Sequence, residues 1–279
     1  MSKLFIKVIL IVLALITLLF LYARYIEPHR LTAVEVFAVN HKADENTGQV
    51  TIAVFADTHF SDIYSPYDFE RAVDMMNGRN PDLILFCGDL IDNYKSYRGD
   101  TEEISRALSR LSAPLGKFAV YGNHDYGGGA SPAYAGIMEA GGFRVLLNES
   151  VAFEHVKLVL IGLDDFVLGK GDINAVAEAA RPDLFNLVFC HVPDVIDELL
   201  EYSVDLMVSG HTHGGQINIP GYKHSFFPPY GQNYHRGNYS FDNDRNTTLH
   251  VNSGLSTTQL PFRFMAPPEV TFICLNRDN

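Results

Sequence analysis

Seven side chains of the types that bind metal ions stand just after short apolar segments of this chain. They are Asp57, His59, Asp89, Asn123, His191, His211 and His213. Segment 50–56, for example, precedes Asp57, and segment 206–209 precedes Gly210 and His211. Apolar runs of this length are typical of strands buried on both faces, and open α/β sheets bind ligands beyond the carboxyl ends of such strands. We therefore expect these side chains to meet at one edge of a sheet.

The chemistry of this set is that of a catalytic metal site. Imidazole nitrogen combined with carboxylate and amide oxygen suits divalent Mn, Fe or Zn, and the lack of cysteine in the set argues against a closed structural zinc site. His211 and His213 are two residues apart, as are Asp57 and His59, so in an extended segment both members of each pair face the same way. A lone histidine would be better explained as a hydrogen-bonded turn residue. The complete set predicts a metal centre.

The segments that must position these residues alternate between strands and helices. Helices are predicted to begin at Ser65-Pro66 and at Thr101, where capping residues precede apolar side chains at helical spacing. Further helices are predicted over 132–140, 172–181 and 193–202, and strands over 143–146, 152–155, 157–163, 248–252 and 269–275. Alternation followed by closely spaced strands indicates an α/β fold with a mixed pair of sheets flanked by helices.

The N-terminus carries the other clear signal. Residues 8–23 are almost purely aliphatic, and with residues 4–6 they approach the ~20 residues that span a bilayer. A cleavable signal peptide is the competing interpretation, but residues 21–25 offer no small-x-small cleavage site. We therefore predict a transmembrane signal anchor over 1–25, a tether with an outer strand near 32–38 over 26–48, and one globular domain over 49–279.

The charges that flank the apolar segment give a weak preference for one orientation. Lys3 and Lys7 precede it, and Arg24 and Arg30 follow it with Glu27 between them. Because positive charge is retained on the cytoplasmic side, this balance favours slightly a cytoplasmic N-terminus. We expect a single-pass protein of the cell membrane with its globular domain outside the cytoplasm.

Composition excludes some classes of partner. The 279 residues carry a formal net charge of −12 and contain no basic run, which argues against nucleic acid as a partner. Cys87, Cys190 and Cys274 each lie in an apolar segment, without Cys-x-x-Cys spacing. We expect them to be small buried side chains that form no disulfide.

The metal-ligand motifs resemble those of a known family. The blocks Asp57-Thr-His59, Gly88-Asp89, Gly122-Asn-His-Asp125, His191 and Gly210-His-Thr-His213 resemble, in order, the five motifs of the calcineurin-like metallophosphoesterases. The resemblance runs from about residue 50 to the C-terminus and implies a four-layer α/β/β/α sandwich. It also implies that Asp57, His59 and His213 hold one divalent ion, that Asn123, His191 and His211 hold another, and that Asp89 bridges the two.

The resemblance further implies a hydrolytic mechanism. A hydroxide that bridges two cations is a strong nucleophile near neutral pH, and both cations neutralise phosphoryl oxygens during in-line displacement. In the family pattern His124 is no ligand; it stabilises the transition state or protonates the leaving-group oxygen. Asp125 follows it directly and is expected to orient that imidazole. A noncatalytic metal-binding scaffold is the alternative, which the complete set of ligands and His124 disfavours.

The remaining motifs concern the substrate. Gly214-Gly215-Gln216, Ser253-Gly254-Leu255 and Pro261-Phe-Arg263 resemble the membrane-anchored bacterial phosphodiesterase branch of the family. This implies hydrolysis of phosphodiester or pyrophosphate bonds in a lipid- or envelope-linked substrate, with a glycolipid pyrophosphate hydrolase of the UDP-2,3-diacylglucosamine type as the alternative. The long aromatic segment 220–245 is expected either to pack over a sheet edge or to form a rim in which Arg236 contacts a second phosphate.

Overall fold

Two six-stranded sheets form the centre of the molecule, which we describe from a computed structural model covering residues 3–45, 47–219, 221 and 227–277. Sheet one has the strand order β1 (Thr32–Asn40), β12 (Glu269–Arg277), β2 (Val50–Phe55), β3 (Leu83–Phe86), β4 (Lys117–Ala119) and β5 (Arg144–Val145). Sheet two has the order β10 (Gly237–Ser240), β11 (Thr248–Val251), β9 (Leu206–Ser209), β8 (Phe185–Phe189), β7 (Leu158–Gly162) and β6 (Glu149–Phe153). Both sheets are mixed, as the sequence predicted.

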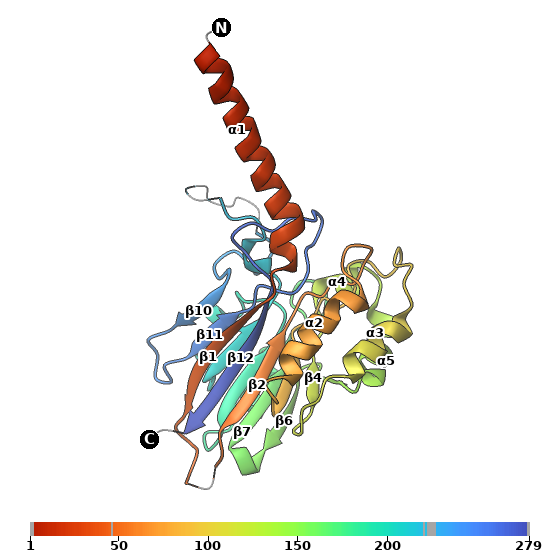
Figure 1. Cartoon of the computed structure of the whole chain (residues 1–279). Helices are drawn as coiled ribbons and strands as arrows, with labels where there is room; N and C mark the ends of the chain where they lie inside the picture. Colours follow the sequence, from red (N-terminus) through yellow and green to blue (C-terminus); the bar gives the residue numbers. More distant parts are fainter. Residues whose placement is uncertain (1–2, 46, 220, 222–226, 278–279) are drawn as a thin grey trace.

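Helices cover the outer face of each sheet. On sheet one lie α2 (Pro66–Asn77), α3 (Thr101–Ser109) and α5 (Ser131–Ala140), and on sheet two lie α6 (Asn174–Ala179) and α7 (Ile196–Leu199). Shorter elements are α4 (Asn123–Gly127) and the 3-10 turns Glu154–Val156 and His213–Gly215. Figure 1 shows α2, α3 and α5 on one side of the strands. The four-layer α/β/β/α sandwich is therefore confirmed.

Three apolar cores separate these layers, and alternation along the strands assigns each side chain to one of them. Phe55 of β2 faces α2 and packs on Phe69, whereas its neighbour Val54 faces the other sheet. The core between the sheets joins Val54 to residues such as Leu187 and Val208 of sheet two. Because β2, β3, β8 and β9 are covered on both faces, they read as continuous apolar runs in the sequence.

The N-terminal helix stands apart from these layers. α1 (Lys3–Leu21) continues through a π-helical turn (Tyr22–Ile26) and a 3-10 turn (Glu27–His29) into β1. Within the described residues it is the one helix long and apolar enough to cross a membrane. All its described side chains are exposed, and Figure 1 shows it projecting from the domain. The helix can therefore serve as a membrane anchor. The predicted outer strand is confirmed as β1, which pairs in parallel with β12.

Two predicted helices are shorter than the sequence pattern indicated. The helix predicted over 193–202 covers only Ile196–Leu199, because the Asp194 carboxylate accepts backbone N–H groups from residues 232–234 and holds its own segment in a turn. The helix predicted over 172–181 ends at Ala179, since Arg181 precedes Pro182 and a residue before proline disfavours helical ψ. Strand β10 was not predicted at all.

Candidate metal centre

The seven candidate ligands lie beyond the carboxyl ends of five strands. Asp57 and His59 follow β2, Asp89 follows β3, and Asn123 begins α4 after β4. His191 follows β8, and the His211–His213 segment follows β9. β2, β3 and β4 are parallel neighbours in sheet one, and β8 and β9 are parallel neighbours in sheet two. The two sheets therefore present their strand ends to a shared cleft.

Five of these residues have left-handed backbone conformations. The φ angles are 53° at Asp57, 40° at His59, 61° at Asp89, 74° at His211 and 51° at His213. Residues other than glycine rarely adopt positive φ, and strain of this kind concentrates at functional sites. The turns that follow the strands therefore hold these residues in strained backbone conformations, which direct their side chains inward.

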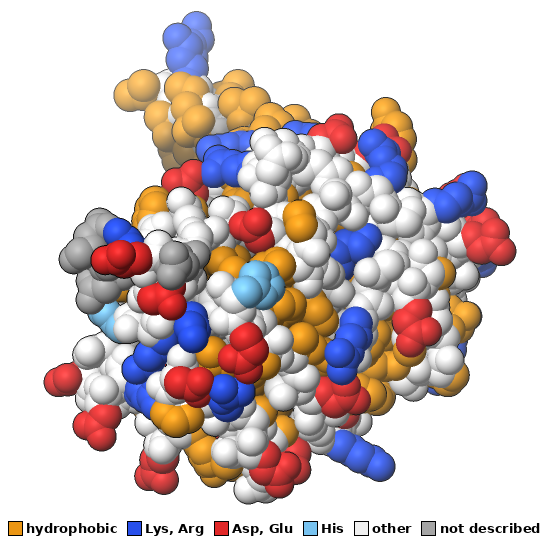
Figure 2. Space-filling model, turned by 90° about the horizontal axis from the view of Figure 1, so that it is seen from below, with side chains coloured by type: hydrophobic (Ala, Val, Ile, Leu, Met, Phe, Trp, Pro, Cys, Tyr) orange, Lys and Arg blue, Asp and Glu red, His pale blue; other side chains and the backbone are white. Residues whose placement is uncertain are grey.

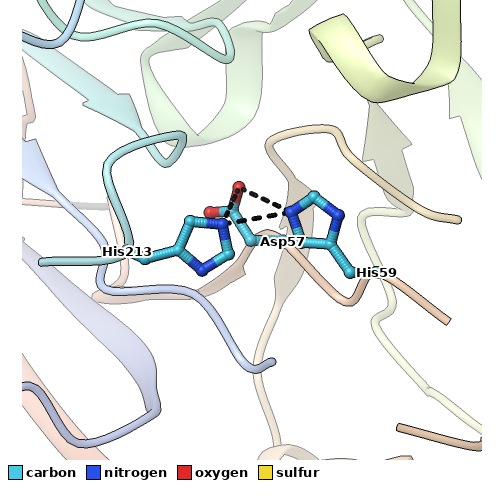
Figure 3. Close-up of side chains that lie close together, drawn as sticks. All are labelled: Asp57, His59 and His213. Atoms are coloured by element: carbon cyan, nitrogen blue, oxygen red, sulfur yellow. Dashed lines mark hydrogen bonds and ion pairs between the residues drawn. The ribbon is translucent and has the colours of Figure 1, made fainter. Parts of the chain in front are cut away.

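Asp57, His59 and His213 form the first cluster (Figure 3). The Nε2 atoms of His59 and His213 lie 3.1 Å apart. The Oδ1 atom of Asp57 lies 3.8 Å from His59 Nε2 and 3.7 Å from His213 Nε2. All three side chains are buried. The spacing of these three donor atoms suits a single bound cation.

Asp89, His191 and His211 form the second cluster, with Asn123 beside it. His191 Nε2 lies 3.0 Å from His211 Nδ1 and 3.1 Å from the amide oxygen of Asn123. The Oδ2 atom of Asp89 is 3.2 Å from His191 Nε2 and 3.5 Å from His59 Nε2. Asp89 therefore lies between the clusters, where a bridging ligand would have to be.

The outer nitrogen of each histidine determines what its inner nitrogen can do. His213 Nδ1 faces the carbonyl oxygen of Ser256 at 3.0 Å, and His191 Nδ1 faces that of Cys87 at 2.7 Å. Each of these outer nitrogens donates, which leaves the lone pair of the neutral imidazole on the inner nitrogen. The same holds for His211, whose Nε2 faces the Pro229 carbonyl at 2.9 Å.

This tautomer pattern is a test of whether a metal fits the site. Lone pairs on the facing nitrogens of His191 and His211, which lie 3.0 Å apart, repel one another unless a proton or a cation lies between them. Histidines that ligate metals commonly donate their other ring N–H to a carbonyl or carboxylate, as His191, His211 and His213 do here. The donor set and its hydrogen-bonded surroundings therefore fit divalent ions.

The pKa values of the second cluster also describe a site that can exchange a proton for a cation. Burial lowers the pKa of His191, but the carboxylates of Asp89, Asp57 and Asp165 together outweigh this and raise it to about 10. Burial and the neighbouring His191 lower the pKa of His211 to about 3, so this imidazole is neutral. Asp89 keeps a pKa well below its usual range because His191 and His59 outweigh the effect of burial. Metal binding at this cluster therefore competes with a proton on His191.

His124 contacts a carboxylate that the sequence analysis overlooked. Its Nδ1 lies 2.7 Å from the backbone oxygen of Asp92 and 3.4 Å from the carboxylate Oδ1 of the same residue. That oxygen also lies 3.3 Å from His59 Nδ1. Asp92 follows Asp89 by three residues, so a second carboxylate shortly after the Gly88-Asp89 block was the available signal.

The role expected for Asp125 is wrong. Its carboxylate accepts backbone N–H groups from Asp89, Leu90 and Gly122 at 2.8–3.0 Å. Asp125 thus ties the loop after β3 to the start of α4, while Asp92 is the residue beside the His124 imidazole. Adjacent residues on a short helix point in different directions, which is why proximity in sequence misled here.

Gly254 permits a close approach behind Asp57. Its φ is 68°, and a Cβ atom there would lie 2.7 Å from the Cβ of Asp57. Nearby, the buried Arg263 guanidinium donates to the carbonyl oxygens of Ser253 and Ala266 at 2.8 Å. The Ser253–Gly254 and Pro261–Arg263 motifs therefore shape the backbone around the first cluster rather than contribute ligands.

The buried carboxylate of Glu269 contacts Ser253, the residue before Gly254, together with Thr271 and His250. It accepts from Ser253 at 2.9 Å and from Thr271 at 3.1 Å, and it lies 3.3 Å from His250 Nε2. Burial raises the pKa of Glu269, but these contacts, led by that with His250, lower it below its usual value. The unfolded chain therefore binds this proton more tightly than the folded one, and stability falls as pH drops below about 4.5.

Glu269→Gln is accordingly expected to lower the melting temperature at pH 7 by several degrees, through loss of roughly 1–3 kcal/mol. The difference from the wild type should shrink as the pH is lowered through the acid range, where the wild-type carboxylate becomes protonated. Thermal unfolding of the full-length protein in detergent measures this, with the exposed Glu198→Gln as control. A gap that stays constant down to pH 3 would contradict the assignment.

A pocket of about 690 Å³ opens above the two clusters. Its walls include His124, the apolar residues Phe227, Pro228 and Pro229, and the segment Thr258–Leu260. Part of the predicted aromatic rim is thus at the site, whereas Phe226 lies outside the described residues. Arg236 does not line this pocket; its guanidinium donates to the Met265 carbonyl oxygen at 2.9 Å.

Comparison with known proteins agrees with this geometry. A family model described as calcineurin-like phosphoesterase matches residues 50–215, a range that contains both clusters. The metallophosphoesterase YkuE of Bacillus subtilis is 38% identical over 262 residues, covering 92% of this chain and 90% of that protein. A metallophosphoesterase of Aquifex aeolicus is 28% identical, covering 87% and 91% respectively. The UDP-2,3-diacylglucosamine pyrophosphatase LpxG of Chlamydia muridarum is 25% identical over 313 residues, covering 93% of each.

Proposed function

We propose that seven side chains of this chain, which belongs to the calcineurin-like phosphoesterases and is a metal-dependent phosphoester hydrolase, hold two divalent cations. Asp57, His59 and His213 would hold the first ion, and Asn123, His191 and His211 the second, with Asp89 shared between them. The observation that carries this proposal is the convergence of histidine nitrogens and aspartate oxygens in two buried clusters on either side of Asp89. Mn, Fe and Zn all suit these donors.

Two cations held there supply an activated water and positive charge for the phosphoryl oxygens. We assign the proton for the leaving-group oxygen to His124, which borders the pocket and has a side chain 28% exposed. Burial lowers the pKa of this imidazole, but Asp89 and the contacts with Asp92 raise it above its ordinary value. A protonated imidazole near neutral pH suits a general acid. Asp92 positions the ring through Nδ1 and leaves Nε2 for the substrate.

For the substrate we propose a phosphodiester or pyrophosphate bond in a lipid- or envelope-linked molecule. The apolar wall formed by Phe227, Pro228 and Pro229 supports this class, as does the N-terminal helix. The pyrophosphatase named above gives a specific second candidate, a UDP-diacylglucosamine type of glycolipid, because the similarity covers nearly all of both chains. We further propose that α1 anchors the protein with the catalytic domain outside the cytoplasm, as the flanking charges favour.

The test is an assay of the full-length protein in detergent, loaded in turn with Mn, Zn or Fe. Chromogenic phosphomonoesters and phosphodiesters would be compared with a UDP-linked glycolipid under each metal. We expect hydrolysis of the diester with at least one metal, and a strong preference for the glycolipid would establish the second candidate. A folded, metal-loaded protein that hydrolyses none of them would refute the proposed function.

Arg236 remains our candidate for contact with a second phosphate. It lies close to the pocket, because its Cδ atom would be 2.9 Å from a Cβ built at Gly214, the residue after His213. We expect Arg236→Ala to raise KM about tenfold for a pyrophosphate-linked substrate, since a hydrogen bond to a charged group is worth roughly 1.5–3 kcal/mol. A simple diester should be unaffected. Arg181→Ala, which removes a distant surface arginine, is the control. Equal KM changes for both substrates would remove the support for this contact.

A further inference from the structure

The end of the N-terminal helix is joined to one wall of the pocket. The Phe20 ring of α1 contacts the Phe262 ring at 5.1 Å between centroids. The backbone N–H of Arg263 donates to the Ala23 carbonyl at 2.9 Å, and that of Ala266 donates to the buried Glu27 carboxylate at 2.6 Å. The helix and segment 262–266 are thus fastened together by backbone as well as ring contacts.

These contacts set the level of the pocket relative to α1. Phe20 is part of the apolar helix, so when α1 lies in a bilayer Phe262 lies at the hydrocarbon boundary. Leu260 is only two residues away, and it both lines the pocket and is 57% exposed. With α1 in a bilayer, the mouth of the pocket would lie near the membrane surface and not at the far end of the domain.

Two further exposed apolar side chains flank the same place. Met265, which is 51% exposed, follows Phe264, and the Phe264 ring contacts Tyr22 at the end of α1. Ile219, which is 53% exposed, follows Asn218, whose backbone N–H donates to the Phe264 carbonyl at 2.8 Å. We call Ile219, Leu260 and Met265 the apolar rim.

Aromatic and basic side chains lie in the segment 22–30 that follows α1. The Arg24 guanidinium lies over the Tyr25 ring at 4.8 Å, and Arg30 donates to the Tyr22 hydroxyl at 3.1 Å. Tyrosine and arginine in this position are typical of a bilayer interface. The face of the domain turned away from α1 differs, because acidic and basic side chains are interspersed over it (Figure 2).

We propose that the apolar rim inserts into the surface of the bilayer beside α1, so that the pocket opens onto the membrane and receives a phosphate ester borne by a membrane lipid. A lipid surface is the occupant because the rim residues flank the segment 262–264, whose aromatic rings contact Phe20 and Tyr22 at the end of the apolar helix. The lipid chains remain in the bilayer while the phosphate reaches the two clusters. This rests on the proposed function in taking the pocket as the active site and α1 as the anchor.

The chain contains no tryptophan, so a single introduced tryptophan reports on its own surroundings. Full-length Leu260→Trp and Ile219→Trp would be reconstituted into vesicles containing brominated lipids. Leu13→Trp, inside α1, is the positive reference, and the exposed Leu147→Trp and Phe37→Trp are the negative ones. We expect blue-shifted emission and loss of fluorescence at positions 260, 219 and 13, and neither change at 147 or 37. Loss at position 13 alone, or at none of these positions, would overturn the insertion of the rim.

Activity measurements on two substrates test the role of the apolar rim independently of the proposed function. Ile219 and Met265 do not line the pocket, and Met265→Asn is chosen because Met265 has a φ of 55°, which asparagine tolerates. We expect the double variant Ile219→Ser/Met265→Asn to lose several-fold in turnover of a phosphate ester embedded in vesicles and to keep wild-type turnover of a water-soluble diester. The variant Phe37→Ser should change neither. Unchanged turnover of the embedded ester by the double variant would overturn entry of the substrate from the bilayer. A wild-type protein inactive on both substrates would refute the proposed function. Insertion of the rim would then be decided by the fluorescence quenching alone.

Discussion

Asp89→Asn is expected to reduce phosphoesterase activity on the order of 10³-fold, because the variant loses the one carboxylate placed between the two clusters. Its Oδ2 atom lies within 3.5 Å of ligand nitrogens in both. Metal-held charge is worth several kcal/mol to phosphoryl transfer, and about 4 kcal/mol corresponds to about 10³-fold in rate. The asparagine keeps the shape and can still accept from the His124 backbone N–H, which Oδ1 does now at 2.8 Å. The loss should therefore come from charge rather than from misfolding.

Three measurements on the same sample check this result. Turnover of a soluble diester gives the activity, elemental analysis gives the metal content, and thermal unfolding verifies the fold. We expect fewer bound metal ions per chain and a folded protein. Asp183→Asn, which removes an exposed surface carboxylate, should alter none of the three. Full metal content with wild-type turnover in Asp89→Asn would contradict the bridging role.

His124→Gln should behave differently, because it is expected to keep the metal ions and still lose about 10²–10⁴-fold in turnover. The imidazole belongs to neither of the two clusters proposed to hold the ions, although it lies with His59 and Asp92 in a third group of possible ligands. It borders the pocket where a leaving group would depart. Removal of a general acid matters most when the leaving oxygen is strongly basic. We therefore expect a much larger loss for an alkyl phosphodiester than for a nitrophenyl one, whose leaving group needs no proton.

The comparison of leaving groups distinguishes this role from a structural one. A residue that only supports the loop would slow both substrates equally. His155→Gln, at an exposed position after β6, is the matched control and should be silent. Asp92→Asn should reproduce part of the His124→Gln effect, since Asp92 lies against Nδ1 of the ring. Release of metal from His124→Gln would instead place this histidine among the ligands.

The positions of the seven candidate ligands were predictable because the rule that places them is local. Strands such as β2, β3 and β9 read as apolar runs buried on both faces, and the residue after such a run lies at the carboxyl edge of the sheet. The alternation of strands and helices predicted a mixed pair of sheets flanked by helices, and the resemblance to the family added the four-layer arrangement. Confirmation of the family adds that the order of these motifs along the chain is meaningful.

Side-chain partners within the site were not predictable in the same way. Asp125 and Asp92 are both near His124 in space, yet only the path of the loop after β3 determines which carboxylate meets the imidazole. That path depends on hydrogen bonds from the backbone N–H groups of Asp89 and Leu90 to the Asp125 carboxylate, which lies 36 and 35 residues further along the chain. Position next to His124 in the sequence therefore favoured the wrong aspartate.

By itself, the amino-acid sequence determined the fold class, the chemistry of the donor set and the presence of an apolar N-terminal segment. The α/β class, the donor types and the apolar segment follow from composition and periodicity over a few consecutive residues, whereas the four-layer arrangement came from the resemblance to the family. The tertiary structure decided which nitrogen of each histidine faces inward, which aspartate meets His124, and where α1 stands relative to the pocket. The last of these depends on Phe20 and Glu27 meeting Phe262 and Ala266 across almost the whole length of the chain, a contact that no local pattern encodes.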